Sequence, residues 1–481
     1  MIRKMIVWVI KPWSNQGSIN LFGRKYMLPS TPAVVAGAVR SQDILEVDVR
    51  IVDENVEEIS FKELPDVVFI SCMTYEAARA YVLAQKFAIR GVKVVLGGVH
   101  PTVMPEEASS YGAVVIGEIE PTLPQLMADL AKGKLKDVYE RVGRTDLDEL
   151  PRPAYDLLQR NKYNNTHSLE HIHGCAFDCD FCTANIVFGD RVHRRSPELL
   201  AQEFRELPSR FAFLSANDIM AAGPGYAKDV CRALVPLNKK WFAQSSVGVV
   251  HDQELMELLP KSGCVALLMG FETLTGDGTD LKKAKNHGFS SLYDYYGYVI
   301  EKLHSRGIAT VACFISGLDD QKDDIFELVD RFIRETNADI PQLTVATAHP
   351  GSKLRANIEA EGRLISGMEN RWECYDIVRP THYPKGMTLD ALLEGYQWLG
   401  DRVYSKKAIL QRISRSRKYL PSLYNSIGVL GAVNPVYKKL YEQSKSIPSV
   451  NPPVGFYNQR DSFGLIISKA MRTTRRFLYP S

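Results

Sequence analysis

The first 135 residues alternate short apolar runs with stretches of helical periodicity. The apolar runs are rich in valine and isoleucine and have the length of buried strands. A repeat of this kind predicts a parallel sheet with helices on both faces. The expected strands are residues 5–10, 45–52, 67–71, 92–96 and 113–116, and the expected helices are residues 32–40, 76–90 and 121–131.

A second alternation runs from about residue 166 to 346 and contains six expected strand–helix units. Six such units predict an open or partial barrel, smaller than a full eight-stranded one. Functional groups of parallel sheets lie beyond the carboxyl ends of the strands. The expected strands are residues 169–171, 211–215, 241–249, 264–271, 308–315 and 341–346, with helices between them, for example at 197–207, 253–261, 292–305 and 323–335.

The pattern therefore predicts an α/β protein of several domains, as expected for 481 residues. Residues 1–135 form a doubly wound domain of the Rossmann or flavodoxin type. Residues 136–165 are a linker, because LDELPRPAYDLL contains two prolines, several charges and no long period. Residues 166–390 form the partial barrel, and residues 391–481 form a mostly helical, basic C-terminal region.

Composition narrows the class of protein. Hydrophobic residues at 45%, charged residues at 24% and a net charge of +3 are ordinary for a soluble protein and give no case for nucleic acid binding. Eight cysteines, most of them scattered, do not resemble a secreted disulfide framework, which indicates the cytoplasm. Lys11 and Pro12 interrupt the apolar N-terminus, and no apolar stretch of about 20 residues predicts a membrane span.

Residues 402–418 contain seven basic residues and no acidic one. Such a run is usually a solvated helix face, although the interleaved apolar residues also allow it to dock on an acidic partner or peripherally on a membrane surface. The basic residues are Arg402, Lys406, Lys407, Arg412, Arg415, Arg417 and Lys418, and a second cluster is Arg472, Arg475 and Arg476.

The chemically distinctive segment is HGCAFDCDFCTAN at residues 173–185. Its three thiols favour zinc or an iron–sulfur cluster. Structural zinc needs a fourth ligand, for which His171 and His173 are the nearby candidates. A four-iron cluster can instead use three cysteines and keep its fourth iron for a small molecule. The segment follows the first expected strand of the barrel, which places it at the functional face.

The spacing Cys175-x-x-x-Cys179-x-x-Cys182, with Phe181 before the last cysteine, resembles the signature of the radical S-adenosylmethionine (SAM) enzymes. The first domain resembles the cobalamin-binding module of a large subfamily of these enzymes, through LGGVHPT at 96–102 and the GE turn at 117–118. Further similar segments are residues 270–273, 314–319 and 349–352. The resemblance covers roughly residues 1–400 and implies a 4Fe-4S cluster, S-adenosyl-L-methionine and cobalamin as cofactors.

The resemblance also implies roles for particular residues. Cys175, Cys179 and Cys182 would ligate the cluster. Glu272, at the end of the fourth barrel strand, would face SAM. The other expected SAM residues are Phe181, Gln244 and Ser246, although the polar residues of the third strand could equally face outward. The expected cobalamin-binding residues are Ser71, Met73, Thr74, Gly97, Gly98, Val99, His100, Gly117 and Glu118.

Two departures from the subfamily matter. No Asp-x-His-x-x-Gly motif is present, so no histidine ligand to cobalt is evident, and His100 is better explained as a turn residue. Ser215 and Ala216 stand where the subfamily often has two aspartates. No catalytic residue is assigned.

The function that the resemblance implies is cobalamin-dependent methylation of an unactivated carbon, through a 5′-deoxyadenosyl radical that abstracts hydrogen. The expected substrate is a bulky molecule of the lipid or tetrapyrrole type, and the expected electron donor is a flavodoxin or ferredoxin. The same scaffold could carry out ring closure or C–H oxidation. A non-catalytic cobalamin- or zinc-binding sensor is the alternative from another class.

Overall fold

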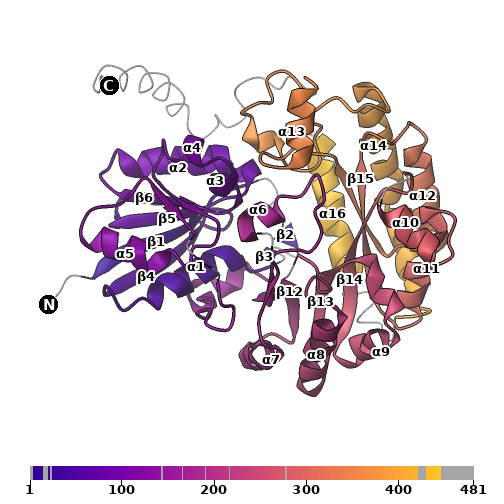
Figure 1. The fold of residues 1–481 in the computed structure, drawn as a ribbon, viewed down its shortest axis with the longest axis horizontal. Coiled ribbons are helices and arrows are strands. Elements are labelled where there is room, and N and C mark those ends of the chain that lie inside the picture. The colour runs from indigo at the N-terminus through magenta and orange to yellow at the C-terminus, as the bar shows by residue number, and fades with distance from the viewer. Residues whose placement is uncertain are drawn as a thin grey trace. The chain divides into compact units, whose positions relative to one another are not determined.

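A computed structural model describes residues 4–14, 20–21, 24–25, 27–141, 143, 145–164, 166–189, 191–215, 217–276, 279–420 and 430–445. Residues 1–441 form one compact unit. It contains two six-stranded sheets, whose strands are coloured indigo to purple and magenta to orange in Figure 1.

The first sheet has the strand order β4-β1-β5-β6-β7-β8, and every neighbouring pair is parallel. The direction of winding reverses between β1 and β5, as at the switch point of doubly wound folds, where ligands bind beyond the strand ends. The strands are β1 (Met5–Lys11), β4 (Val47–Asp53), β5 (Val67–Ser71), β6 (Lys93–Gly97), β7 (Ala113–Ile116) and β8 (Val138–Glu140).

Apolar side chains cover both faces of this sheet, because alternate residues of each strand point in opposite directions. Val7, Val9 and Phe69 pack on one side, whereas Trp8 and Ile70 pack on the other. The covering helices begin and end as follows: α1 (Ser30–Arg40), α2 (Ala77–Ala88), α3 (Val99–Val103), α4 (Pro105–Ala108) and α5 (Leu123–Ala131).

The periodicity located the first five strands of this sheet to within a few residues, but it did not signal β8. That strand has three residues and lies inside the segment expected to be a linker. It pairs with β7 and completes the sheet. The rest of the segment contains two short 3-10 helices, η2 (Tyr155–Leu157) and η3 (Arg160–Lys162).

The second sheet has the order β16-β15-β14-β13-β12-β9, again parallel throughout. Six parallel strands with intervening helices confirm the predicted partial barrel. The strands are β9 (His167–Glu170), β12 (Phe211–Ser215), β13 (Lys240–Ser245), β14 (Cys264–Glu272), β15 (Ala309–Ser316) and β16 (Ile340–Val345).

Most helices of the barrel pack on the outward residues of these strands in one large apolar cluster. The third strand is shorter than expected, since it ends at Ser245 and is followed by the 3-10 helix η5 (Val247–His251). The helices are α6 (Ala184–Phe188), α7 (Pro197–Glu206), α8 (Pro224–Leu234), α9 (Gln253–Lys261), α10 (Thr279–Asn286), α11 (Leu292–His304), α12 (Ile325–Thr336) and α13 (Lys353–Ala360).

The chain continues through η6 (Trp372–Cys374) into three further helices, α14 (Leu389–Val403), α15 (Lys406–Ser416) and α16 (Leu430–Lys445). Among the described helices, none is both long and apolar enough to cross a membrane. The predicted basic cluster at residues 472–476 lies outside the described residues.

Three members of the basic run at residues 402–418 bond within the protein. Arg402 pairs with Asp330 at 3.0 Å, Arg412 is buried, and Arg415 donates to the carbonyl of Arg334 at 2.7 Å. The charge that this run presents to a partner or a surface is therefore smaller than the sequence suggests.

Candidate functional site

The loop with the three cysteines follows the first strand of the barrel and is held at both ends. The short strand β10 (Ile172–His173) pairs with β11 (His193–Arg194) at its base. At its tip, the carbonyl of Asp180 accepts a hydrogen bond of 2.8 Å from the amide of Leu354 in α13, and Lys353 pairs with Asp178. The loop is therefore attached to the barrel on two sides.

The two exposed thiols of the chain belong to this loop. Cys179 and Cys182 are exposed and Cys175 is half-buried, whereas four of the other five cysteines are buried. Within the described residues, no three His, Cys, Asp or Glu side chains gather closely enough to hold a single metal ion. Three thiols at these intervals along one loop can each hold a separate corner of a polynuclear cluster.

The two histidines considered as a fourth zinc ligand have different surroundings. His171 is fully buried beside Tyr226, and its ring nitrogens have no partner among the described residues. The Nδ1 atom of His173 lies 2.6 Å from Glu118 Oε1, and its Nε2 atom lies 3.3 Å from Glu170 Oε2. The two glutamates therefore engage His173, which does not suit it as a zinc ligand.

Asp218 is a residue that the sequence analysis did not select. It lies after β12, and its Oδ1 accepts hydrogen bonds from the amides of Met220 at 2.8 Å and Ser246 at 3.0 Å. Its Oδ2 is buried and has no partner among the described residues. Burial raises the pKa of Asp218, and burial together with the nearby Asp218 charge raises the pKa of Cys175. A carboxylate therefore lies at the barrel mouth, three residues after Ser215. The sequence showed only that Ser215 and Ala216 stand where the subfamily often has two aspartates.

Glu272 ends β14 at a break in the strand register and has a positive φ of 54°. This backbone conformation is unusual for a residue other than glycine and often marks functional positions. The carboxylate folds back over Gly270, because a Cβ atom placed on Gly270 would lie 2.1 Å from Glu272 Oε1. Gly270 is thus the residue that makes room for this carboxylate.

The other expected SAM residues lie around the same mouth. Gln244 is half-buried on β13, and Ser246 follows that strand beside Asp218. Phe181 is half-buried in the cysteine loop. Asp218 and Ser246 are thus in direct contact, and Asp218 and Cys175 are close enough to interact electrostatically.

A mostly apolar cavity lies beyond the carboxyl ends of β1, β5, β6 and β7. Seven of the nine residues expected to bind cobalamin line it. The second domain completes its wall through Glu170, His173, Val187 and Phe188. The seven residues are Ser71, Met73, Gly97, Gly98, Val99, Gly117 and Glu118.

Two glycine turns shape this cavity. Gly98 has φ of 93°, and a Cβ there would lie 2.7 Å from Ser71 Oγ. Gly117 has φ of 80°, and a Cβ there would lie 3.2 Å from the carbonyl of Val187 in α6. Thr102 Oγ1 links the turns, since it donates to the carbonyl of Gly98 at 2.8 Å and accepts from the amide of Gly117 at 3.0 Å. Side chains at these turns would collide with Ser71 and Val187, so both positions need glycine and leave bare backbone at the cavity, which suits the close approach of a flat ligand such as a corrin.

A buried ionic network forms the wall between this cavity and the barrel. His173 bonds Glu118 and Glu170, and Arg141 bonds Glu118 at 3.2 Å and the carbonyl of Phe188 at 2.7 Å. Burial opposes the charge of His173, but the two glutamates outweigh it and raise its pKa to about 10. The network ties the GE turn of the first domain to the start of the cysteine loop.

Thr74 and His100 are not among the residues that line the cavity. Thr74 is buried in the 3-10 helix η1 (Thr74–Glu76). His100 is fully buried between Tyr81 and Trp372, and its ring nitrogens have no partner among the described residues. Burial lowers its pKa to about 3, so the ring is neutral.

Family comparisons agree with this geometry. Residues 29–127 match the B12 binding domain, and residues 169–333 match the Radical SAM superfamily. The chain therefore carries a B12 binding domain followed by a Radical SAM domain.

Two relatives are similar to this chain in sequence, and one solved structure is similar to it in fold. The bacteriochlorophyllide d C-12(1)-methyltransferase of Chlorobaculum tepidum is 29% identical over 360 residues, which cover 72% of this chain and 76% of that protein. The hopanoid C-2 methylase of Rhodopseudomonas palustris is 24% identical over 367 residues, which cover 73% of this chain and 68% of that protein. The radical SAM methyltransferase TsrM of Kitasatospora setae, with tryptophan and a SAM analogue bound, has the same fold, with a TM-score of 0.62, 12% identity and coverage of 92% and 100%.

Proposed function

We propose that this protein is a cobalamin-dependent radical SAM methyltransferase that methylates an unactivated carbon of a tetrapyrrole. The supporting observation is the shared wall of the cavity at the first sheet. Glu170 and His173, which precede the cysteine loop, belong to that wall together with the GE turn of the first domain. A methyl carrier in the cavity and a radical source at the loop would face a common space.

In this proposal Cys175, Cys179 and Cys182 ligate a 4Fe-4S cluster, which the exposure of Cys179 and Cys182 and the spacing of the three thiols along one loop support. Glu272, Gln244, Ser246 and Phe181 contact SAM. We add Asp218, because its buried Oδ2 lacks a partner among the described residues and suits a ligand that carries an ammonium or hydroxyl donor.

Cobalamin would lie against the glycine turns at Gly97–Gly98 and Gly117, with Ser71, Met73, Val99 and Glu118 around it. When bound, cobalamin supplies the methyl group, and the cluster with SAM supplies the means to open a C–H bond. The chain itself positions these groups, excludes water and supplies hydrogen-bond partners. An external one-electron donor of the flavodoxin or ferredoxin class provides the electrons.

The domain assignment follows the same reasoning. We assign residues 1–135 with β8 to cobalamin, residues 166–390 to the radical chemistry, and the C-terminal helices to closure of the barrel. We choose a tetrapyrrole because the bacteriochlorophyllide d C-12(1)-methyltransferase is more similar by sequence than the hopanoid C-2 methylase, over about the same share of the chain. A polycyclic lipid is the second candidate, in view of the hopanoid methylase.

The test is anaerobic reconstitution with iron, sulfide, cobalamin and SAM, followed by reaction with bacteriochlorophyllide d or a hopene in the presence of reduced flavodoxin or ferredoxin, and mass spectrometry of all products. The proposal expects a methylated tetrapyrrole together with S-adenosylhomocysteine and 5′-deoxyadenosine. If 5′-deoxyadenosine forms without S-adenosylhomocysteine, the protein is not a methyltransferase. An oxidised or ring-closed product would then identify the alternative reaction. Methylation of the hopene alone would place the substrate among lipids.

A further inference from the structure

The inner face of the barrel carries a pair of polar residues that the proposed cofactor sites do not use. Ala312, Phe314 and Leu343 belong to the apolar cluster under the outer helices. Because side chains alternate along a strand, Cys313 on β15 and Gln342 on β16 face the inside of the barrel. The two residues are directly opposite each other in the ladder, and both are half-buried.

This pair lies close to the proposed SAM site. The strand register pairs Cys313 with Gly270, the residue over which the Glu272 carboxylate folds. The negative charge of Glu272 contributes, after burial, to raising the pKa of Cys313, which also indicates that the groups are near one another. Gln342 is therefore one strand beyond Cys313 and at the same level of the barrel.

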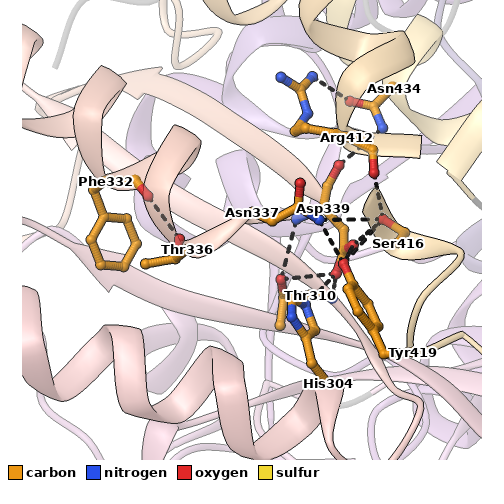
Figure 2. Close-up of polar contacts among 10 residues, drawn as sticks. All are labelled: His304, Thr310, Phe332, Thr336, Asn337, Asp339, Arg412, Ser416, Tyr419 and Asn434. Carbon is orange, nitrogen blue, oxygen red and sulfur yellow. Dashed lines mark hydrogen bonds and ion pairs between the residues drawn. The ribbon is translucent and has the colours of Figure 1, made fainter. Parts of the chain in front are cut away.

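The C-terminal helix α16 reaches this level because a polar network holds it (Figure 2). Asn434 Nδ2 donates to the carbonyl of Asp339 at 3.1 Å, and Asn434 Oδ1 accepts from Arg412 Nη2 at 2.8 Å. The Asp339 carboxylate is fully buried and accepts hydrogen bonds from Ser416 at 2.7 Å and from His304 at 2.9 Å. Through Asp339, which directly precedes β16, the network joins α11, α15 and α16 at the amino end of that strand.

Tyr437 lies three residues after Asn434 and therefore on the same side of α16. Its hydroxyl donates to Gln342 Oε1 at 2.9 Å, and the Cys313 thiol donates to the same oxygen at 3.3 Å. Two donors on Oε1 fix the orientation of the amide. The Nε2 group has no partner among the described residues, so it presents unused donors to the inside of the barrel.

We infer that Gln342 is a substrate-positioning residue whose Nε2 group donates to a carbonyl or carboxylate oxygen of the tetrapyrrole, with Tyr437 of α16 holding the amide in place. The inference rests on the proposed function. It also makes the C-terminal region part of the substrate site. A polycyclic hydrocarbon has no oxygen acceptor and would gain nothing from this donor.

The test compares reconstituted wild-type holoenzyme with three variants. Gln342→Glu keeps the shape and the acceptor for Tyr437 but loses the amide donors. Tyr437→Phe removes the hydroxyl donor to Gln342 Oε1 and leaves only the Cys313 thiol to orient the amide. Tyr441→Phe is the matched control, since it removes a hydroxyl from the same helix that bonds the carbonyl of Gln397 at 2.7 Å, away from Gln342. Each is assayed for iron, cobalamin, SAM affinity, bacteriochlorophyllide d affinity by fluorescence quenching, and turnover.

For Gln342→Glu we expect bacteriochlorophyllide d to bind roughly 10-fold or more weakly, with KM raised and kcat little changed. The reason is that the carbonyl or carboxylate oxygen of the tetrapyrrole loses the hydrogen bond from Gln342 Nε2. Tyr437→Phe should weaken binding about 3-fold, and Tyr441→Phe should not change it. Iron, cobalamin and SAM affinity should stay at wild-type levels in all three.

Wild-type affinity for bacteriochlorophyllide d in Gln342→Glu would overturn the inference, and so would a loss confined to SAM affinity. Failure of the wild-type protein to bind the tetrapyrrole would overturn it as well. If the tetrapyrrole binds through Gln342 but is not methylated, the positioning role stands and the proposed reaction fails.

Discussion

The carboxyl ends of the two parallel sheets form two different kinds of site. At the first sheet, glycine turns linked by Thr102 and a buried ionic wall enclose a cavity with a mostly apolar lining. At the barrel, two exposed thiols, a strained Glu272 and a carboxylate oxygen of Asp218 without a described partner surround the mouth. The first site is defined by shape, and the second is defined by donor atoms.

The carboxyl ends of parallel strands can thus form either a cavity for a large ligand or a set of donor atoms for a metal cluster. A large flat ligand gains most from close contact with backbone, which only residues without a side chain allow. A metal cluster gains most from its ligating atoms, whatever surrounds them. Added volume should therefore damage the first site, and loss of a donor should damage the second.

The largest effect is expected for Cys179→Ala. Loss of one of three thiolates should abolish iron binding and lower SAM cleavage by more than about 100-fold, while cobalamin binding remains. Iron analysis, absorption spectra and product assays measure the three quantities. Cys231→Ala, at a buried thiol, is the control that should keep its iron. SAM cleavage at the wild-type rate in Cys179→Ala would refute the assignment of the cluster.

Gly98→Val should produce the opposite pattern. A branched side chain at φ of 93° and 2.7 Å from Ser71 Oγ strains the turn by about 1–3 kcal/mol, so cobalamin should bind roughly 10- to 100-fold more weakly while iron content is kept. Equilibrium dialysis of cobalamin gives the affinity. Gly133→Ala also has a positive φ but has no neighbour within 4 Å, and it should bind cobalamin normally. Equal loss in both variants would show that backbone strain alone, not the turn, is responsible.

Gly270→Ala tests whether volume also matters at the second site. The new methyl group would displace the Glu272 carboxylate, and we expect SAM to bind about 10-fold more weakly with iron and cobalamin unchanged. Isothermal titration of the reconstituted protein provides the measurement. Gly225→Ala in α8 has open space around its Cβ and is the control. Unchanged SAM affinity in Gly270→Ala would remove Glu272 from the SAM site.

The smallest effect is expected for His100→Phe. His100 has a pKa of about 3 in the folded protein and about 6.5 in an unfolded chain. The unfolded state therefore takes up the proton first as the pH falls, and stability is lost between roughly pH 6.5 and 3. Phenylalanine fits between Tyr81 and Trp372 and should reduce the difference in stability between pH 7 and pH 4 by about 3 kcal/mol.

Thermal unfolding of His100→Phe at the two pH values measures this change, and the electron paramagnetic resonance spectrum of bound Co(II) tests the site itself. Cobalamin should bind as in the wild type with an unaltered spectrum. A changed spectrum would mean that the His100 ring reaches cobalt.

The sequence alone determined the two sheets, the cysteine loop and the glycine turns. These features are local in the sequence. Strand periodicity shows within a few residues, and the loop and the turns correspond to contiguous motifs such as residues 173–185 and 97–102. The pattern missed β8, because three residues are too few for a period to show.

Only the tertiary structure decided which groups from distant segments meet. It placed Asp218 within electrostatic range of Cys175, joined His173 to Glu118 across 55 residues, turned His100 away from the cavity, and brought Tyr437 to Gln342 across 95 residues. Contacts of this range depend on how strands register and how helices pack, and a single sequence carries no local pattern for them.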